Sequence, residues 1–266
     1  MKRMLITLLL VGLAVVANAA VSISTVGQTY SQNFDSLGST DGTSYIFTDN
    51  GTLAGWWVNS EEMDSNSDEY FAENGSASGG EVYSFGDDQA TDRALGYVGS
   101  GGNDFFNMAL GLSNDTGETL DKIVVSYTGE QWRSGGNTDD NNNILVFSYR
   151  IFDAGSGSIP ASTSQSGWTT VSGLDFAAPQ TSIAVGSLDG NQPENQTDFS
   201  NVEISGLTWS DGQELWIRFA GNDGSGTDAG LAVDDFSVQA VPEPATIAMF
   251  GIGGFIAFII RRSALK

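Results

Sequence analysis

The chain has 266 residues, with 33 acidic and ten basic side chains and a formal charge of −23 at pH 7, and it contains no cysteine and no histidine. Such a charge repels phosphate backbones and argues against nucleic acid as a partner. Without cysteine there are no disulfides or thiolate sites, and without histidine the usual general base and the commonest transition-metal ligand are missing.

The first 19 residues have the pattern of a secretory signal peptide. Met1 to Met4 form a cationic segment, Leu5 to Val16 an apolar one, and Ala17 to Ala19 a cleavage site of small residues. We expect cleavage after Ala19, because the apolar stretch is short for the alternative, a retained membrane helix. Residues 20–240 are then expected to fold outside the cytoplasm.

Residues 20–240 are predicted to form one β domain. Apolar and polar residues alternate in short runs that Gly, Asn, Asp and Ser separate, with no convincing helical period. Strands are predicted at residues 106–112, 123–127, 144–152, 215–219 and 231–238. Trp216 is out of phase with its apolar neighbours and is expected to face away from the core or to pack under a loop. The pattern predicts an all-β fold, a two-sheet antiparallel β-sandwich of jelly-roll type.

Two segments of the body resemble extracellular bacterial jelly-roll modules, including carbohydrate-binding ones. They are Gln32-Asn-Phe-Asp35 near the start and Gly230 to Val238 near the end. In such modules the first and last strands lie close together, and an acidic residue from each can share a structural calcium ion. The resemblance therefore implies a possible calcium site at Asp35 with Asp234 or Asp235.

Two acidic stretches present oxygen side chains at alternate positions, as calcium-binding loops do. One contains Asp64 and Asp68, and the other covers residues 137–143. Neither is a complete EF-hand, because Glu69 replaces the turn glycine of the first and both lack the final glutamate. Calcium is a possible cofactor, and the alternative is that these are solvated loops.

The aromatic composition suggests a carbohydrate-binding module as an alternative function. Aromatic faces stack on sugar rings, and the body has six tryptophans. The glycine-flanked segment Gly129 to Gly136 holds Trp132 and Arg133, which form the predicted glycan contact. For each tryptophan, packing in the core is the competing interpretation.

Catalytic patterns are absent from the sequence. Ser-His and Cys-His arrangements cannot be built, and carboxylate pairs will occur by chance among so many acidic residues. Glu62-Met-Asp-Ser-Asn66 lacks the second glutamate of the glucanase strand motif. We expect no enzyme, with a glycoside hydrolase as the least favoured alternative.

The C-terminal segment, residues 241–266, is a separate module. Pro242, Glu243 and Pro244 precede an uncharged run from Thr246 to Ile260, which ends at Arg261 and Arg262. As a single transmembrane helix the run would span roughly 22 Å, somewhat less than the ~30 Å hydrocarbon core. The arginine pair would stop it on the cytoplasmic side. The alternative, a buried C-terminal helix, would leave two arginines hard to place.

This order of features resembles the PEP-CTERM sorting tail of Gram-negative bacteria. The resemblance implies that Pro242, Glu243 and Pro244 are recognised by an exosortase, a membrane-embedded transpeptidase-like protease, which processes the tail during export. We therefore expect an exported, non-catalytic protein of the cell envelope or extracellular matrix. It would be anchored in the inner membrane before processing and would then reach the cell surface or medium. Polysaccharide and other envelope components are the further partners expected.

Overall fold

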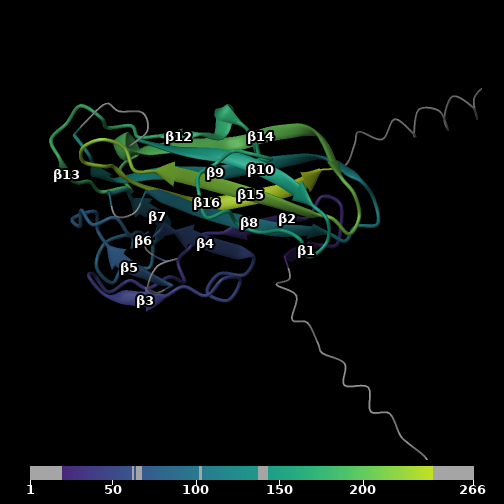
Figure 1. The fold of residues 1–266 in the computed structure, drawn as a ribbon, viewed down its shortest axis with the longest axis horizontal. Coiled ribbons are helices and arrows are strands. Elements are labelled where there is room, and N and C mark those ends of the chain that lie inside the picture. Colours follow the sequence, from purple (N-terminus) through teal and green to yellow (C-terminus); the bar gives the residue numbers. More distant parts are fainter. Residues whose placement is uncertain (1–19, 62, 64–67, 102–103, 137–142, 242–266) are drawn as a thin grey trace, which may run out of the picture.

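The computed structural model describes residues 20–61, 63, 68–101, 104–136 and 143–241, which form a two-sheet β-sandwich (Figure 1). Sheet A runs in the order β1 (Val21–Ile23), β8 (Phe105–Asn114), β15 (Glu214–Asn222), β10 (Ile144–Phe152) and β11 (Thr169–Thr170), with β4 (Trp56–Ser60) beside β8 and β12 (Phe176–Ala177) beside β10. Sheet B runs in the order β13 (Gly186–Ser187), β9 (Leu120–Ser134), β16 (Gly230–Val241), β7 (Ala94–Val98), β6 (Val82–Phe85), β5 (Glu69–Glu73) and β3 (Ser44–Ile46). The two remaining strands are β14 (Gln196–Trp209), which pairs with β9, and β2 (Thr29–Gln32), which pairs with β16. Two 3-10 turns are also described, η2 (Ser172–Leu174) and η3 (Pro193–Asn195).

The predicted all-β sandwich is confirmed, and each of the five predicted strands lies within β8, β9, β10, β15 or β16. The sequence pattern missed β14, which is 14 residues long, because most of its side chains are exposed or only partly buried and its pairing with β9 has two register shifts. The other strands that it missed are short. Alternation over two to five residues is too brief to stand out from a loop, and these strands are held by their neighbours in the sheet instead.

The core lies between the two sheets and is built by one face of each long strand. In the pairing of β15 with β8, Phe219 lies opposite Met108 and Ile217 opposite Leu110, and all four side chains are buried. Val233 of β16 faces the same core from sheet B. Each such side chain contributes roughly 1.5–3 kcal/mol through removal from water.

The sheets are not purely antiparallel. Strand β1 runs parallel to β8, and β5 runs parallel to β6, with Phe71 opposite Tyr83. Two parallel strands cannot be joined by a tight hairpin, because the chain must first return to the end of the sheet at which the first strand began. Residues 74–81 make this return between β5 and β6, and they cover part of the outer face of sheet B.

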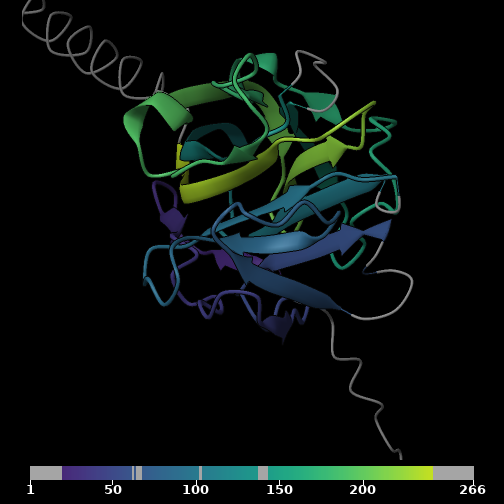
Figure 2. The same cartoon turned by 90° about the vertical axis from the view of Figure 1, so that its left-hand side faces the viewer.

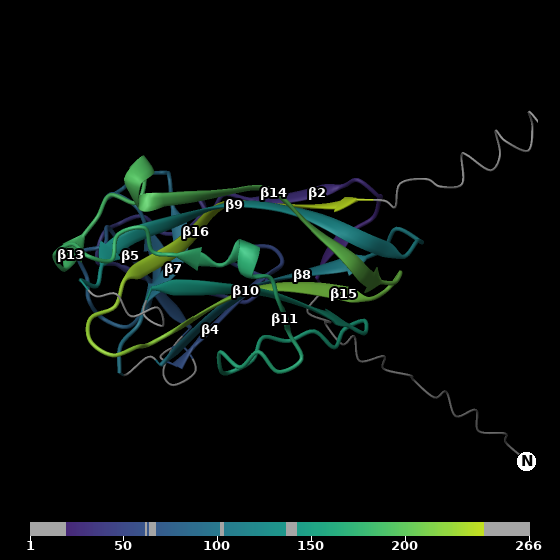
Figure 3. The same cartoon turned by 90° about the horizontal axis from the view of Figure 1, so that it is seen from above.

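Strand β1 begins and β16 ends at the same end of the sandwich (Figures 1 and 3). The backbone links the two regions there, because the N–H of Gly27 donates to the carbonyl oxygen of Ala240 at 2.7 Å. Seen end-on, the early strands in purple and blue lie below the later strands in green and yellow (Figure 2).

Candidate functional site

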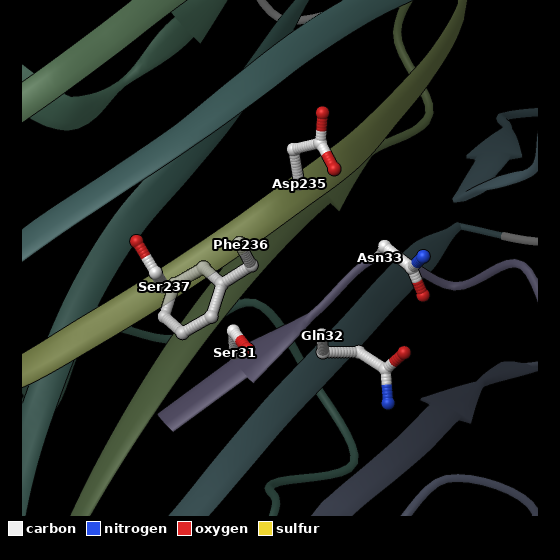
Figure 4. A pocket seen from close by; sticks show the side chains of 6 residues that line it. All are labelled: Ser31, Gln32, Asn33, Asp235, Phe236 and Ser237. Atoms are coloured by element: carbon white, nitrogen blue, oxygen red, sulfur yellow. The ribbon is translucent and has the colours of Figure 1, made fainter. Parts of the chain in front are cut away.

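A polar pocket of about 370 Å³ lies where β2 meets β16. It is lined by Ser31, Gln32, Asn33, Asp235, Phe236 and Ser237. The ladder between β16 and β9 shifts register between Asp234 and Ser237, and Asp235 has a φ of 47°. Such a bulge re-aims side chains and bends the strand. In Figure 4 the polar side chains spread along both strands and do not close on one point.

A buried carboxyl pair, Glu130 and Asp234, lies beside this bulge. The two side chains come from β9 and β16 and are 2% and 5% exposed. The Glu130 oxygens accept the indole N–H of Trp132 at 2.9 Å and the amide of Gln196 at 3.1 Å. Asp234 accepts the backbone N–H of Asp235 at 2.7 Å.

Burial raises the pKa of Glu130 to about 7. Burial and then the charge of Glu130 raise the pKa of Asp234 to about 8. Near neutral pH the two carboxyls therefore retain protons that exposed carboxyls would have lost. Chemically, the pair can hold and release protons, although it is enclosed.

The predicted calcium residues are only partly brought together. Strand β2 pairs with β16, so Asp35 lies near the bulge. Its oxygens already accept the side chain of Asn33 and the backbone N–H of Arg93, at 2.6 and 3.3 Å. Calcium takes six to eight oxygen ligands, yet the described part of the chain holds no group of three or more Asp, Glu, His or Cys side chains placed for a metal.

The other predicted calcium loop is described only in part. Asp68 lines a pocket of about 240 Å³ with Asp49 and Asn59, whereas Asp64 and residues 137–142 lie outside the described residues. Burial, with a smaller contribution from Asp68, raises the pKa of Asp49. Calcium binding stays a prediction for both locations.

The predicted glycan contact, Trp132 and Arg133, is covered by other parts of the chain. Trp132 is 1% exposed and packs under a turn in which a Cβ on Gly190 would lie 2.3 Å from the indole nitrogen. Arg133 donates to the carbonyl oxygens of Gly75 and Ser76 at 3.2 and 3.1 Å. Both side chains thus anchor loops on the outer face of sheet B, and neither offers a free surface for stacking.

An equivalent cluster on the outer face of sheet A was not predicted from the sequence. Trp216 lies beneath residues 153–168, and Glu214 accepts its indole N–H at 2.9 Å. Arg218 donates to Ser148, to the Ser164 carbonyl and to Gln165, and it lies 4.4 Å from the Trp168 ring. Burial lowers the pKa of Arg218 to about 10. The repeated Glu-x-Trp pattern, followed by arginine, is the signal that could have revealed both clusters.

A groove of about 310 Å³ opens between the edges of the two sheets. The β10–β14 groove is lined by Tyr149, Arg150, Ile151, Gly167, Thr169, Gly206, Leu207 and Thr208. The Arg150 guanidinium lies 4.5 Å from the Phe152 ring. The lining of the groove includes threonine hydroxyls and the Arg150 guanidinium. It includes no tryptophan, because all six tryptophans are buried elsewhere.

The predicted sorting motif, membrane span and arginine pair lie outside the described residues. Within residues 20–241, apart from the gaps given above, no helix is long and apolar enough to cross a membrane.

Comparison with known proteins gives distant structural similarities and one sequence match. The chain superposes on the CBM22-1 xylan-binding domain of Xyn10C from Paenibacillus barcinonensis with 11% identity and a TM-score of 0.32, covering 82% of this chain and 98% of that one. A cleaved adhesin domain of Lys-gingipain from Porphyromonas gingivalis is 12% identical with a TM-score of 0.36, and the match covers 74% of this chain and 99% of that one. The family 11 carbohydrate-binding module from Clostridium thermocellum is 12% identical with a TM-score of 0.28, and the match covers 75% of this chain and 97% of that one. No curated protein matches the sequence significantly. Residues 240–263 match the PEP-CTERM protein-sorting motif.

Proposed function

We propose that the protein is an exported, non-catalytic component of the cell envelope or extracellular matrix, delivered through its C-terminal tail. The observation that carries the proposal is the match of residues 240–263 to the PEP-CTERM sorting motif. A signal peptide at residues 1–19 directs export, and the segment from Thr246 to Ile260 then holds the chain in the inner membrane. Arg261 and Arg262 stop it there, and an exosortase processes the chain near Pro242, Glu243 and Pro244.

The lining of the β2–β16 pocket supports a display role in preference to glycoside hydrolysis there. Glycoside hydrolysis needs two carboxyls facing a substrate. Only Asp235 contributes a carboxyl to the lining of the β2–β16 pocket, and Glu130 and Asp234 beside it are buried.

The surface charge supports the same role. Three of the five basic side chains in the body, Arg93, Arg133 and Arg218, are buried and donate to backbone carbonyls. Because these three arginines are buried, acidic side chains dominate the charged groups on the surface of the domain. Such a surface suits a hydrated matrix that contains cations or basic partners.

Fractionation of cells that hold the matching exosortase tests the delivery. We expect the full-length chain to yield a shortened product at the surface or in the medium, and intact mass to show loss of both terminal segments. A triple alanine variant at Pro242, Glu243 and Pro244 should stay membrane-bound at full length. A soluble, full-length wild-type protein in the cytosol would contradict the proposal.

A second candidate function is carbohydrate binding in the β10–β14 groove. Threonine hydroxyls and the Arg150 guanidinium can donate to sugar oxygens, and this polar lining is the observation that favours it. Affinity electrophoresis of the exported product on polysaccharide gels, with and without calcium, tests the idea. Retardation should be lost in Arg150→Gln and kept in Lys122→Gln, a control at a lysine outside the groove. Equal mobility on every polysaccharide would reject this function.

A further inference from the structure

No spacer separates the folded domain from the sorting motif. The matched motif begins at Ala240, whereas β16 runs to Val241. Two residues of the motif are therefore also residues of the sandwich. Ala240 is 2% exposed and belongs to the hydrophobic core.

Both edges of β16 are occupied close to this boundary. On one edge the Ala240 N–H donates to Gln28 at 3.1 Å, and its carbonyl accepts from Gly27 at 2.7 Å. On the other edge β9 pairs with Ala240 through Ile123 and with Val241 through Lys122. The backbone just before Pro242 is thus bound within sheet B.

A protease that binds its substrate in an extended conformation needs free backbone groups on that substrate. A strand paired on both edges offers very few, so upstream contacts in β16 would require its end to unzip. Unzipping would break ladder hydrogen bonds and expose the buried side chains of Val238 and Ala240. Pro242 itself lacks a backbone N–H, so no ladder bond can be donated from that position.

We infer that the folded sandwich sets the position of tail cleavage, so that the peptide bond that is cut lies C-terminal to Pro242. This inference rests on the proposed function, because it presupposes that the tail is processed. In the reaction the acyl carbon leaves the amine of the membrane segment and is transferred to water or to an amine acceptor. The product then carries a new carboxylate or a new amide. In both cases the mature domain keeps β16 whole.

Insertion of a spacer tests the inference in the full-length chain. A Gly-Ser-Gly-Ser insertion between Val241 and Pro242 frees the motif from the sheet, and the same insertion between Ser182 and Ile183 is the matched control. Processing by the exosortase in cells should be at least about tenfold faster with the spacer, a factor equivalent to about 1.4 kcal/mol of strand opening. The control insertion should process at the wild-type rate.

Intact mass of the product gives the second readout. We expect the wild-type product to end at Pro242 or beyond. A product that ends at Val241 or earlier, or a spacer that leaves the rate unchanged, overturns the inference while leaving delivery through the tail intact. If instead the wild type and the triple alanine variant are both unprocessed, the proposed function itself fails.

A site-specific protease provides an arm that does not depend on the exosortase. Its recognition sequence replaces residues 242–248, either directly after Val241 or after the four-residue spacer. The spaced site should be cut faster in the folded protein, and urea that unfolds the sandwich should equalise the two rates. Equal rates in the folded protein would overturn the inference.

Discussion

The outer faces of the two sheets use the same local arrangement in different surroundings. On sheet A the carboxylate of Glu214 accepts the indole N–H of Trp216, and on sheet B Glu130 accepts that of Trp132, both at 2.9 Å. Residues two apart on a strand share a face, so the Glu-x-Trp spacing is enough to bring each pair together. A loop then covers each indole.

The two clusters differ in what else the glutamate contacts. Glu214 also accepts the backbone N–H of Gly155 at 2.9 Å, so it fixes the covering loop. Glu130 contacts a side chain of β14 and lies near Asp234, and burial raises its pKa to about 7. The same Glu-x-Trp pattern therefore fixes a covering loop on sheet A and places a carboxyl group with a raised pKa on sheet B.

Removal of the indoles should have the largest effect. Trp216→Ala and Trp132→Ala each delete a fully covered side chain, and we expect each to lower the free energy of unfolding by about 3–5 kcal/mol. The loss should be greater at Trp216, whose ring lies 4.4 Å from that of Trp57, than at Trp132, which lies 6.1 Å from Phe85. Urea unfolding measures both. A loss below about 1 kcal/mol at either site would show that its covering loop does not pack as described.

Filling the space above each indole should have the next largest effect. A Cβ on Gly157 would lie 1.9 Å from the Trp216 nitrogen, and one on Gly190 2.3 Å from that of Trp132. Gly157→Ala and Gly190→Ala should displace the loops at a cost of about 1–3 kcal/mol and change the near-UV circular dichroism. Gly173→Ala is the control, because no atom lies within 4 Å of its Cβ position. An unchanged spectrum in both loop variants would contradict the close packing.

Five of the long strands and the orientation of Trp216 could be predicted from the sequence, because both follow from alternation within a few residues. The long strand β14 could not, because two register shifts and a mostly exposed surface break its alternation. For Trp132 core packing was the competing interpretation, but the turn that covers its indole could not be predicted. Its glycine-rich neighbourhood is typical of an open loop, but β9 continues through it to Ser134, and the covering turn at Gly190 is distant in the chain. Local pattern carries no information about such a cover.

The carboxyl pair could not be predicted from the sequence for a related reason. Glu130 and Asp234 meet only through the register of β9 with β16 and the bulge at Asp235. Among 33 acidic residues, nothing in composition distinguishes these two. The resemblance nominated Asp234 for calcium, which stays a prediction. Its burial and the nearby charge of Glu130, which raise its pKa, depend on the fold and have no local sequence signal.

The titration of sheet B should give a smaller effect that depends on pH. The folded-state pKa of Asp234, about 8, lies above its ordinary value of about 3.9, so the folded protein holds more protons between these values. The contribution of Asp234 to the free energy of unfolding is then full below about pH 4 and falls as the pH rises towards 8. Asp234→Asn removes the ionisation and retains an acceptor for the Asp235 N–H. We expect it to stabilise the protein by about 1–2 kcal/mol at pH 9 and to leave it unchanged at pH 4.

Thermal unfolding across this pH range is the measurement for Asp234→Asn. The control is Glu118→Gln, which removes an exposed charge and so accounts for general relief of repulsion in an acidic protein. Equal gains in both variants at pH 9 would mean that net charge, and not the buried pair, sets the pH dependence.

The two glutamates themselves give the smallest and most direct comparison. In Glu214→Gln one amide oxygen must replace two carboxylate oxygens, so either the Gly155 or the Trp216 donor loses its acceptor, at about 1 kcal/mol. Glu130→Gln loses one acceptor in the same way, but at pH 8 it also removes a charge that burial disfavours. We therefore expect Glu214→Gln to destabilise at pH 8 and Glu130→Gln to be neutral or stabilising, as measured by urea unfolding. The same loss in both variants would mean that the two clusters are electrostatically equivalent, because the two glutamates differ only in the surroundings of the carboxyl group.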